Sequence, residues 1–160
     1  METLLLFAYG TLKSDQPEHS LHCSPPLSIQ PAKARGVLWR LREGYPILQV
    51  EPELCLLDAT HDLVGDWKRA AEAANGSPPD LADAKWIEGE LFEYPLEAQV
   101  LRKMDAWENF VPKQRSPYQR RAIWVKDQSG ADRVAWAYVR YSPPNWAVQL
   151  SATRWTPELR

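Results

Sequence analysis

A single glutamate stands where a predicted helix ends, among aromatic residues. Glu108 directly follows Trp107 and comes two residues before Phe110. A carboxylate at the carboxyl end of a helix meets the negative end of the helix dipole, and aromatic neighbours withdraw it from water; both effects raise its pKa. A general base that works near neutral pH needs such a shift. Glu108 is therefore a candidate acid/base, although a solvated loop glutamate is the simpler interpretation of the local pattern alone.

A glycine turn follows the first apolar segment of the chain, at Tyr9-Gly10-Thr11-Leu12. Successive backbone N–H groups in such a turn can bind an anion, and a glycine allows a ligand to approach the backbone closely. A plain tight turn explains the same residues, because one glycine is a weak signal beside a glycine-rich phosphate loop. The turn is thus a candidate site for a carboxylate or a phosphate.

Basic residues gather around Tyr118. Alternation along a strand would place Tyr118 and Arg120 on one face and Gln119 and Arg121 on the other, so that only part of the cluster could contact one ligand. An edge strand protected by charge explains the pattern equally well. The basic residues of this segment are Lys113, Arg115, Arg120, Arg121 and Lys126.

Metal chemistry has little support in the sequence. The two cysteines, Cys23 and Cys55, are too far apart for a Cys-x-x-Cys site and are expected to be buried free thiols. The three histidines, His19, His22 and His61, lie in polar, turn-like stretches and receive no role. We therefore expect no metal and no cofactor.

Six segments have the composition or alternation of β-strands. Residues 86–94 form the clearest one, and its alternation places Glu88 and Glu90 on a single face. The last two segments are separated by Asp127-Gln128-Ser129-Gly130, which predicts a hairpin. The six predicted strands are residues 3–8, 36–41, 47–50, 86–94, 118–125 and 133–141.

Three helices are predicted between these strands. A short one is expected after a cap at Ser14 or Asp15, and an alanine-rich one over residues 66–75. The third begins at Pro95, a residue tolerated in a first helical turn, and leads to Glu108. Residues 24–31 contain three prolines and are predicted to be a loop.

The order of these elements predicts the fold class. Strands and helices do not alternate regularly, which disfavours a doubly wound parallel sheet and favours an α+β fold with a mixed, curled, barrel-like sheet and two or three helices. A chain of 160 residues can bury one sizeable core without metals or disulfides. Its formal charge of −2 argues against a surface built for nucleic acid.

Taken together, these short motifs resemble the gamma-glutamylcyclotransferase-like family, which includes the plant AIG2-like proteins. The resemblance runs from residue 4 to about residue 139 and rests on the order and approximate spacing of the motifs. Asn109 stands where a glycine commonly follows the family's catalytic glutamate. The matching residues are Tyr9-Gly10-Thr11-Leu12, Gly36-Val37-Leu38-Trp39, Gly44-Tyr45-Pro46, Gly89-Glu90-Leu91-Phe92, Leu101, Asp105, Glu108, Tyr118 and Arg120.

The resemblance implies an activity and a set of roles. The family cyclises a γ-glutamyl amine or γ-glutamyl peptide to 5-oxoproline and releases the amine, without a cofactor. By resemblance, Glu108 would be the catalytic acid/base. The resemblance also implies a substrate site formed by Tyr9, Gly10, Thr11, Leu12, Tyr118 and Arg120.

Two other functions fit the same residues. A non-catalytic module could keep the pocket and bind a small molecule without turnover. A nucleic-acid-binding barrel could use the basic strand, with Tyr118 and Trp124 as stacking surfaces, although the net acidity counts against it. We expect a cytoplasmic protein with a small-molecule partner, no nucleic acid and no membrane association. One domain is expected over residues 1–142, with an insertion at 60–85 and a C-terminal extension at 143–160.

Overall fold

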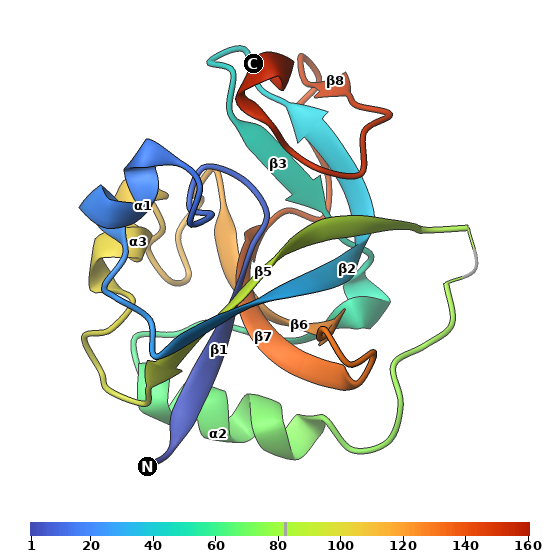
Figure 1. The fold of residues 1–160 in the computed structure, drawn as a ribbon. Coiled ribbons are helices and arrows are strands. Elements are labelled where there is room, and N and C mark those ends of the chain that lie inside the picture. Colours follow the sequence, from blue (N-terminus) through green and yellow to red (C-terminus); the bar gives the residue numbers. More distant parts are fainter. Residues whose placement is uncertain (82) are drawn as a thin grey trace.

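The structure, a computed structural model, describes residues 1–81 and 83–160 and is built on one curled, mixed sheet of eight strands. Five strands close into a barrel in the order β2-β5-β1-β7-β6, because β6 pairs back onto β2 at Lys33 and Lys126 (Figure 1). The pairing of β1 with β7 is parallel, and the other pairings between named strands are antiparallel. The predicted α+β class with a barrel-like sheet is confirmed.

The three remaining strands lie outside the barrel and pair with two of its strands. β3 and β8 pair with the C-terminal end of β2, and β4 pairs with β6. Three α-helices and two short 3₁₀ turns complete the described residues. The elements are β1 (Thr3–Ala8), α1 (Pro17–His22), β2 (Ser28–Arg40), β3 (Pro46–Gln49), η1 (Pro52–Leu54), β4 (Cys55–Asp58), α2 (Leu63–Ala73), β5 (Lys85–Pro95), α3 (Arg102–Trp107), β6 (Gln119–Lys126), β7 (Asp132–Val139), β8 (Val148–Gln149) and η2 (Pro157–Leu159).

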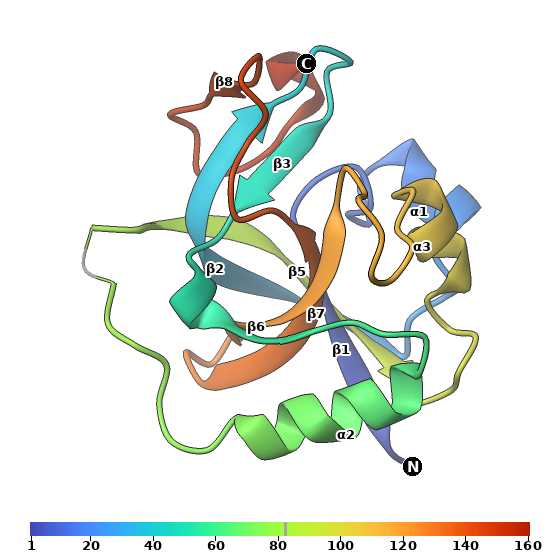
Figure 2. The ribbon, with the colours of Figure 1, turned by 180° about the vertical axis from the view of Figure 1, so that it is seen from behind.

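Alternation along the strands divides the core into two layers. On β1, Leu5 and Phe7 belong to the cluster that fills the barrel, whereas Leu4 and Leu6 belong to a second cluster outside it. Helices cover the outer cluster: α1 and α3 lie side by side, and α2 crosses near the beginning of β1 (Figures 1 and 2). The barrel therefore presents apolar side chains on both faces of β1, which is why that strand is almost continuously apolar.

Prolines account for two differences from the predicted elements. Residues 28–31 are part of β2 and not a loop. This part of β2 pairs with β5 on one side, and its other side is an unpaired edge. Pro31 is tolerated there because the N–H group that proline lacks is not needed for a hydrogen bond between strands. Pro95 ends β5 and does not begin a helix; α3 begins seven residues later, at Arg102.

The other helices begin at different residues from those predicted. α1 starts at Pro17, after Gln16, whose side chain makes no capping bond, so neither Ser14 nor Asp15 is its cap. α2 begins at Leu63, where the Asp62 side chain accepts a hydrogen bond from the Gly65 N–H at 3.0 Å. Of the two cysteines, Cys23 is buried as expected, but Cys55 is only partly buried.

No helix in the described residues combines the length and the apolar character that crossing a membrane would require.

Asp66 is a buried charge that attaches the start of α2 to the preceding loop. Its side chain is fully buried, accepts hydrogen bonds from the Thr60 N–H at 2.7 Å and the Thr60 hydroxyl at 2.8 Å, and pairs with Arg69. We expect Asp66→Ala to lower the free energy of unfolding by about 2–4 kcal/mol, because it leaves buried donors without their acceptor. Urea denaturation measures this loss. Asp62→Ala, which removes only the exposed cap of the same helix, should cost about 1 kcal/mol, and equal losses would contradict the role given to Asp66.

Candidate active site

Glu108 lies in a small pocket at the end of β1, together with the glycine turn and three tyrosines. The pocket has a volume of about 20 Å³, enough for about one water molecule. Its walls come from β1, the loop after β1, the start of β3, the end of α3 and the strands β6 and β7 or the residues beside them. The lining residues are Phe7, Ala8, Tyr9, Gly10, Thr11, Leu12, Pro46, Glu108, Tyr118 and Tyr138.

The end of α3 fixes the direction in which the chain leaves Glu108. Asn109 adopts a left-handed conformation with φ of 55° and donates its N–H to the Ala106 carbonyl at 3.2 Å. The Phe110 N–H donates to the Asp105 carbonyl at 2.8 Å. This pair of bonds is a Schellman motif, which usually places a glycine at the left-handed position and accepts asparagine there. Asn109 therefore takes the left-handed position that a glycine usually occupies in this motif.

A buried ion pair attaches α3 to the sheet. Arg120 on β6 is 3% exposed and donates from Nε to the Asp105 carboxylate at 2.9 Å and from Nη2 at 3.3 Å. The Tyr138 hydroxyl donates to the same carboxylate at 2.6 Å. The guanidinium also lies over the ring of Trp136, 4.8 Å from its centroid. Asp105 thus joins α3 to β6 and β7, one helical turn before Glu108.

The environment of Glu108 makes its carboxyl group a weak acid. Withdrawal from water, and secondarily the negative charge of Asp105, raise the pKa of Glu108 to about 8. Its carboxylate makes no hydrogen bond with the described residues that would favour the charged form. A group with this pKa can both accept and return a proton near neutral pH.

The pocket tyrosines are held as neutral hydrogen-bonding groups. The Tyr9 hydroxyl donates to the Tyr138 carbonyl at 2.6 Å, and the Tyr118 hydroxyl donates to the Pro46 carbonyl at 2.7 Å. Burial raises the pKa of Tyr9, Tyr118 and Tyr138 well above the usual tyrosine value, and Asp105 or Glu108 raise it further. Their phenols therefore stay protonated, and those of Tyr9 and Tyr118 bring distant segments together at the pocket.

The glycine turn presents unused donors. Among the residues the structure describes, the N–H groups of Gly10, Thr11 and Leu12 have no hydrogen-bond acceptor, whereas the Lys13 N–H closes the turn on the Gly10 carbonyl at 3.1 Å. The turn is not the start of α1, which begins only at Pro17. An anion bound here would therefore be held by the N–H groups of the loop itself and not by a helix terminus.

The structure explains the glycine at position 10 differently from the sequence, which suggested that it gives a ligand access to the backbone. A Cβ at this position would lie 2.5 Å from Pro46 Cγ. The missing side chain therefore leaves room for the proline that roofs the pocket and not directly for a ligand. Pro46 is the first residue of β3 and directly follows Gly44 and Tyr45 of the β2–β3 connection, so the start of β3 lines the pocket beside the turn.

The structure brings together most of the candidate site residues. Tyr9, Gly10, Thr11, Leu12, Tyr118 and Glu108 line one pocket, but Arg120 does not line it. The Arg120 guanidinium donates to Asp105 through Nε and Nη2, so in this structure it anchors α3. Sequence reasoning missed Tyr138, which no local motif marks, and Pro46 as a lining residue.

Metal binding finds no support in the part of the chain that the structure describes: no group of three or more His, Cys, Asp or Glu side chains is arranged to hold an ion.

Comparison with known families agrees with this geometry. A sequence model described as "Gamma-glutamyl cyclotransferase, AIG2-like" matches residues 59–157, which include Glu108, Tyr118 and Arg120 but not the glycine turn. The chain belongs to this family. A comparison with curated proteins found no match.

Solved structures with related folds come from distant sequences. An AIG2-like protein from Mus musculus is 19% identical and superposes with a TM-score of 0.57 over 91% of this chain and 83% of the mouse chain. YkqA from Bacillus subtilis is 17% identical, with a TM-score of 0.55 over 96% of this chain. This chain spans only 40% of the length of YkqA. At these identities the similarity shows the AIG2-like fold alone.

The two adjacent arginines of β6 provide a matched test of the anchor. Arg120→Met should lower the free energy of unfolding by about 3 kcal/mol, because it leaves the partly buried Asp105 without its counter-charge. Arg121→Met should cost about 1 kcal/mol or less, because its partner Asp58 is 69% exposed. Chemical denaturation of both variants measures the difference. Equal stabilities would refute the anchoring role of Arg120.

The raised pKa of Glu108 predicts a pH-dependent effect on stability. In the folded protein Glu108 keeps its proton up to about pH 8, whereas in the unfolded chain it loses it near its ordinary value of 4.5. The free energy of unfolding should therefore fall as the pH rises through this window. Glu108→Gln removes the effect, so its stability relative to the unsubstituted protein should increase between about pH 5 and about pH 8 and then level off.

Thermal or urea unfolding at several pH values measures this difference, with the exposed Glu97→Gln as a control for the loss of one negative charge. A Glu108→Gln stability increment that stays constant over the whole range would mean that the carboxyl group is not withdrawn from water.

Proposed function

We propose that the chain is a γ-glutamyl cyclotransferase-type enzyme, which converts a γ-glutamyl amine or γ-glutamyl peptide to 5-oxoproline and a free amine. The observation that carries the proposal is the weakly acidic Glu108 in the same pocket as the unused N–H donors of the glycine turn. Membership of the AIG2-like family supports it.

The proposed reaction needs one proton acceptor and a folded-back substrate. The ionised carboxylate of Glu108 takes a proton from the α-ammonium group of the γ-glutamyl unit. The freed amine attacks the γ-amide carbonyl carbon, forming a C–N bond and a tetrahedral intermediate. Glu108 then gives this proton to the departing nitrogen and takes the second proton from the ring nitrogen, while the original amide C–N bond breaks and the carbonyl re-forms. The second proton leaves with the amine, so the two products are 5-oxoproline and an ammonium ion. One carboxyl group thus serves as base and then as acid.

The glycine turn would hold the other end of the same unit. The N–H groups of Gly10, Thr11 and Leu12 are suited to the α-carboxylate, since backbone donors bind an anion without adding a mobile side chain. Fixing this carboxylate would hold the amine close to the carbonyl it attacks, which converts the ring closure into a well-oriented intramolecular step. No oxidant, metal or nucleotide enters this scheme.

Substrate binding requires the pocket to widen. A volume of about 20 Å³ does not admit a γ-glutamyl group. Pro46 forms the roof over Gly10, and the Tyr45 ring contacts Trp107 edge-on, with centroids 6.2 Å apart. We infer that the start of β3, together with the connection that precedes it, moves away from the turn to admit the substrate.

The proposal predicts a specific loss of turnover. Glu108→Gln keeps the size of the side chain but cannot accept the ammonium proton, so 5-oxoproline release should fall by about 10²- to 10⁴-fold. The loss should appear in kcat with little change in KM, because the amide still fits beside the ammonium. For the unsubstituted enzyme, kcat/KM should rise with pH towards the Glu108 pKa of about 8, because the base must be ionised.

The assay measures 5-oxoproline release from a panel of γ-glutamyl dipeptides and γ-glutamyl amines, with Glu97→Gln as the matched control. Wild-type turnover by Glu108→Gln would show that the assigned mechanism is wrong. An unsubstituted protein that binds these compounds but turns none over would replace the enzyme with a small-molecule binding module.

A further inference from the structure

A second, much larger cavity lies outside the barrel, on the face of β2 and β5. Its volume is about 480 Å³, within the range of small-molecule sites. Five segments distant in sequence contribute to it: the loop after β1, β2, β5, the β6–β7 hairpin and the segment after β8. We propose that this cavity binds a small zwitterion, namely a free amino acid with an apolar side chain.

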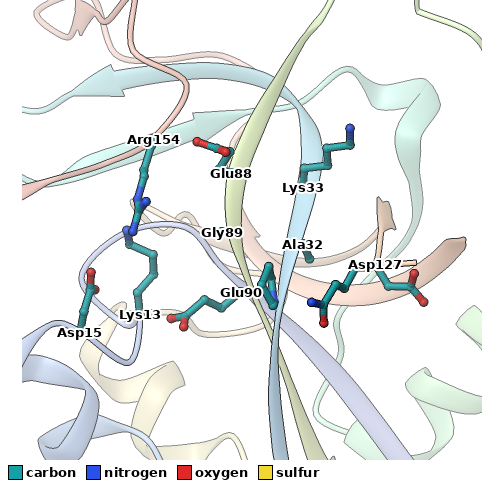
Figure 3. A pocket seen from close by; sticks show the side chains of 11 residues that line it. Lys13, Asp15, Ala32, Lys33, Glu88, Gly89, Glu90, Asp127 and Arg154 are labelled. Carbon is teal, nitrogen blue, oxygen red and sulfur yellow. The ribbon is translucent and has the colours of Figure 1, made fainter. Parts of the chain in front are cut away.

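Two cations form one side of the cavity (Figure 3). Lys13 is only 3% exposed, and among the described residues its ammonium donates to one acceptor, the Trp155 carbonyl, at 2.9 Å. An ammonium group has three donors, so two remain for another acceptor. The Arg154 side chain extends toward the end of the Lys13 side chain in Figure 3 and acts on it electrostatically. Burial, and repulsion from Arg154, act to lower the pKa of Lys13, and a bound carboxylate would relieve both.

Carboxylates lie beside these cations, and their negative charge disfavours a ligand that is only an anion. Asp15, Glu88 and Glu90 all act on Lys13 electrostatically. Glu90 is already occupied, accepting from the Ser14 N–H at 2.7 Å and the Ser14 hydroxyl at 2.6 Å. Glu88 makes no side-chain hydrogen bond or ion pair with the described residues. A dianion such as phosphate would be repelled by this group, whereas an ammonium would be attracted to it.

The arrangement matches the two charges of an amino acid. An α-carboxylate and an α-ammonium are carried on the same carbon, and the cavity places Lys13 and Arg154 next to Glu88 and Asp15 (Figure 3). Pro31 of β2 adds an exposed, uncharged ring on which an aliphatic side chain can pack. A ligand that carries only one of the two charges would leave the opposite group of side chains without a partner.

This cavity and the Glu108 pocket are separate sites. Their lining residues do not overlap. They adjoin along the loop after β1, where Leu12 lines one and Lys13 lines the other, and across the pairing of β1 with β5, where Ala8 lies opposite Glu90. The proposal therefore does not depend on the cyclotransferase activity.

The test titrates the full chain with l-leucine and with two analogues that each lack one charge. 4-Methylpentanoate lacks the ammonium, and 3-methylbutylamine lacks the carboxylate. Amide NMR shifts should move around Lys13, Gly89 and Arg154 with l-leucine. Each analogue should bind about tenfold more weakly or worse, because a charge-assisted contact is lost. Binding of l-leucine should be unchanged in Glu108→Gln.

Variants assign the binding to the named side chains. Arg154→Gln and Glu88→Gln are exposed substitutions that should fold normally, and each should weaken l-leucine binding about tenfold or more. Lys68→Gln and Glu72→Gln remove the same charges from the exposed face of α2 and should leave binding unchanged.

Four results would overturn the proposal. These are no binding of l-leucine up to about 10 mM, an analogue that binds within tenfold of l-leucine, shifts centred on Gly10 and Glu108, or full binding by both Arg154→Gln and Glu88→Gln.

Discussion

The buried ion pair between Asp105 and Arg120 is the interaction on which the position of the candidate acid/base depends. α3 has six residues, too few to form a stable helix by itself in water. Its place is set by what it packs against, and Asp105 connects it through two donors of Arg120 and the hydroxyl of Tyr138 to adjacent strands of the barrel. Glu108 follows three residues later, so its position in the pocket depends on the contacts among Asp105, Arg120 and Tyr138.

Local patterns predicted the strands and much of the pocket, because period-two alternation and a glycine turn are written in neighbouring residues. The same patterns failed where a distant partner decides the outcome. Nothing near Arg120 indicates that Asp105 occupies its guanidinium, and nothing near Gly10 indicates that Pro46 approaches it. The sequence predicts a loop at Pro31, because proline is tolerated in a strand only where no neighbouring strand needs its N–H group. One edge of β2 lacks such a neighbour, and no local pattern indicates this.

The two cavities differ in the polar groups that line them. The small one is dominated by buried, neutral phenols and one weakly acidic carboxyl group, whereas the large one is lined by charges of both signs. The loop after β1 serves both, since its backbone faces Glu108 and the Lys13 side chain turns toward Arg154.

The proline roof over Gly10 also bears on which product a reactive γ-amide would give. A carbonyl held near Glu108 could be attacked by the substrate's own amine or by water, and the second route would yield glutamate instead of a ring. The pocket has space for about one water before it widens, so a γ-glutamyl group that fills the widened pocket would displace the solvent beside its carbonyl. Exclusion of water from the filled pocket would then favour lactam formation over hydrolysis.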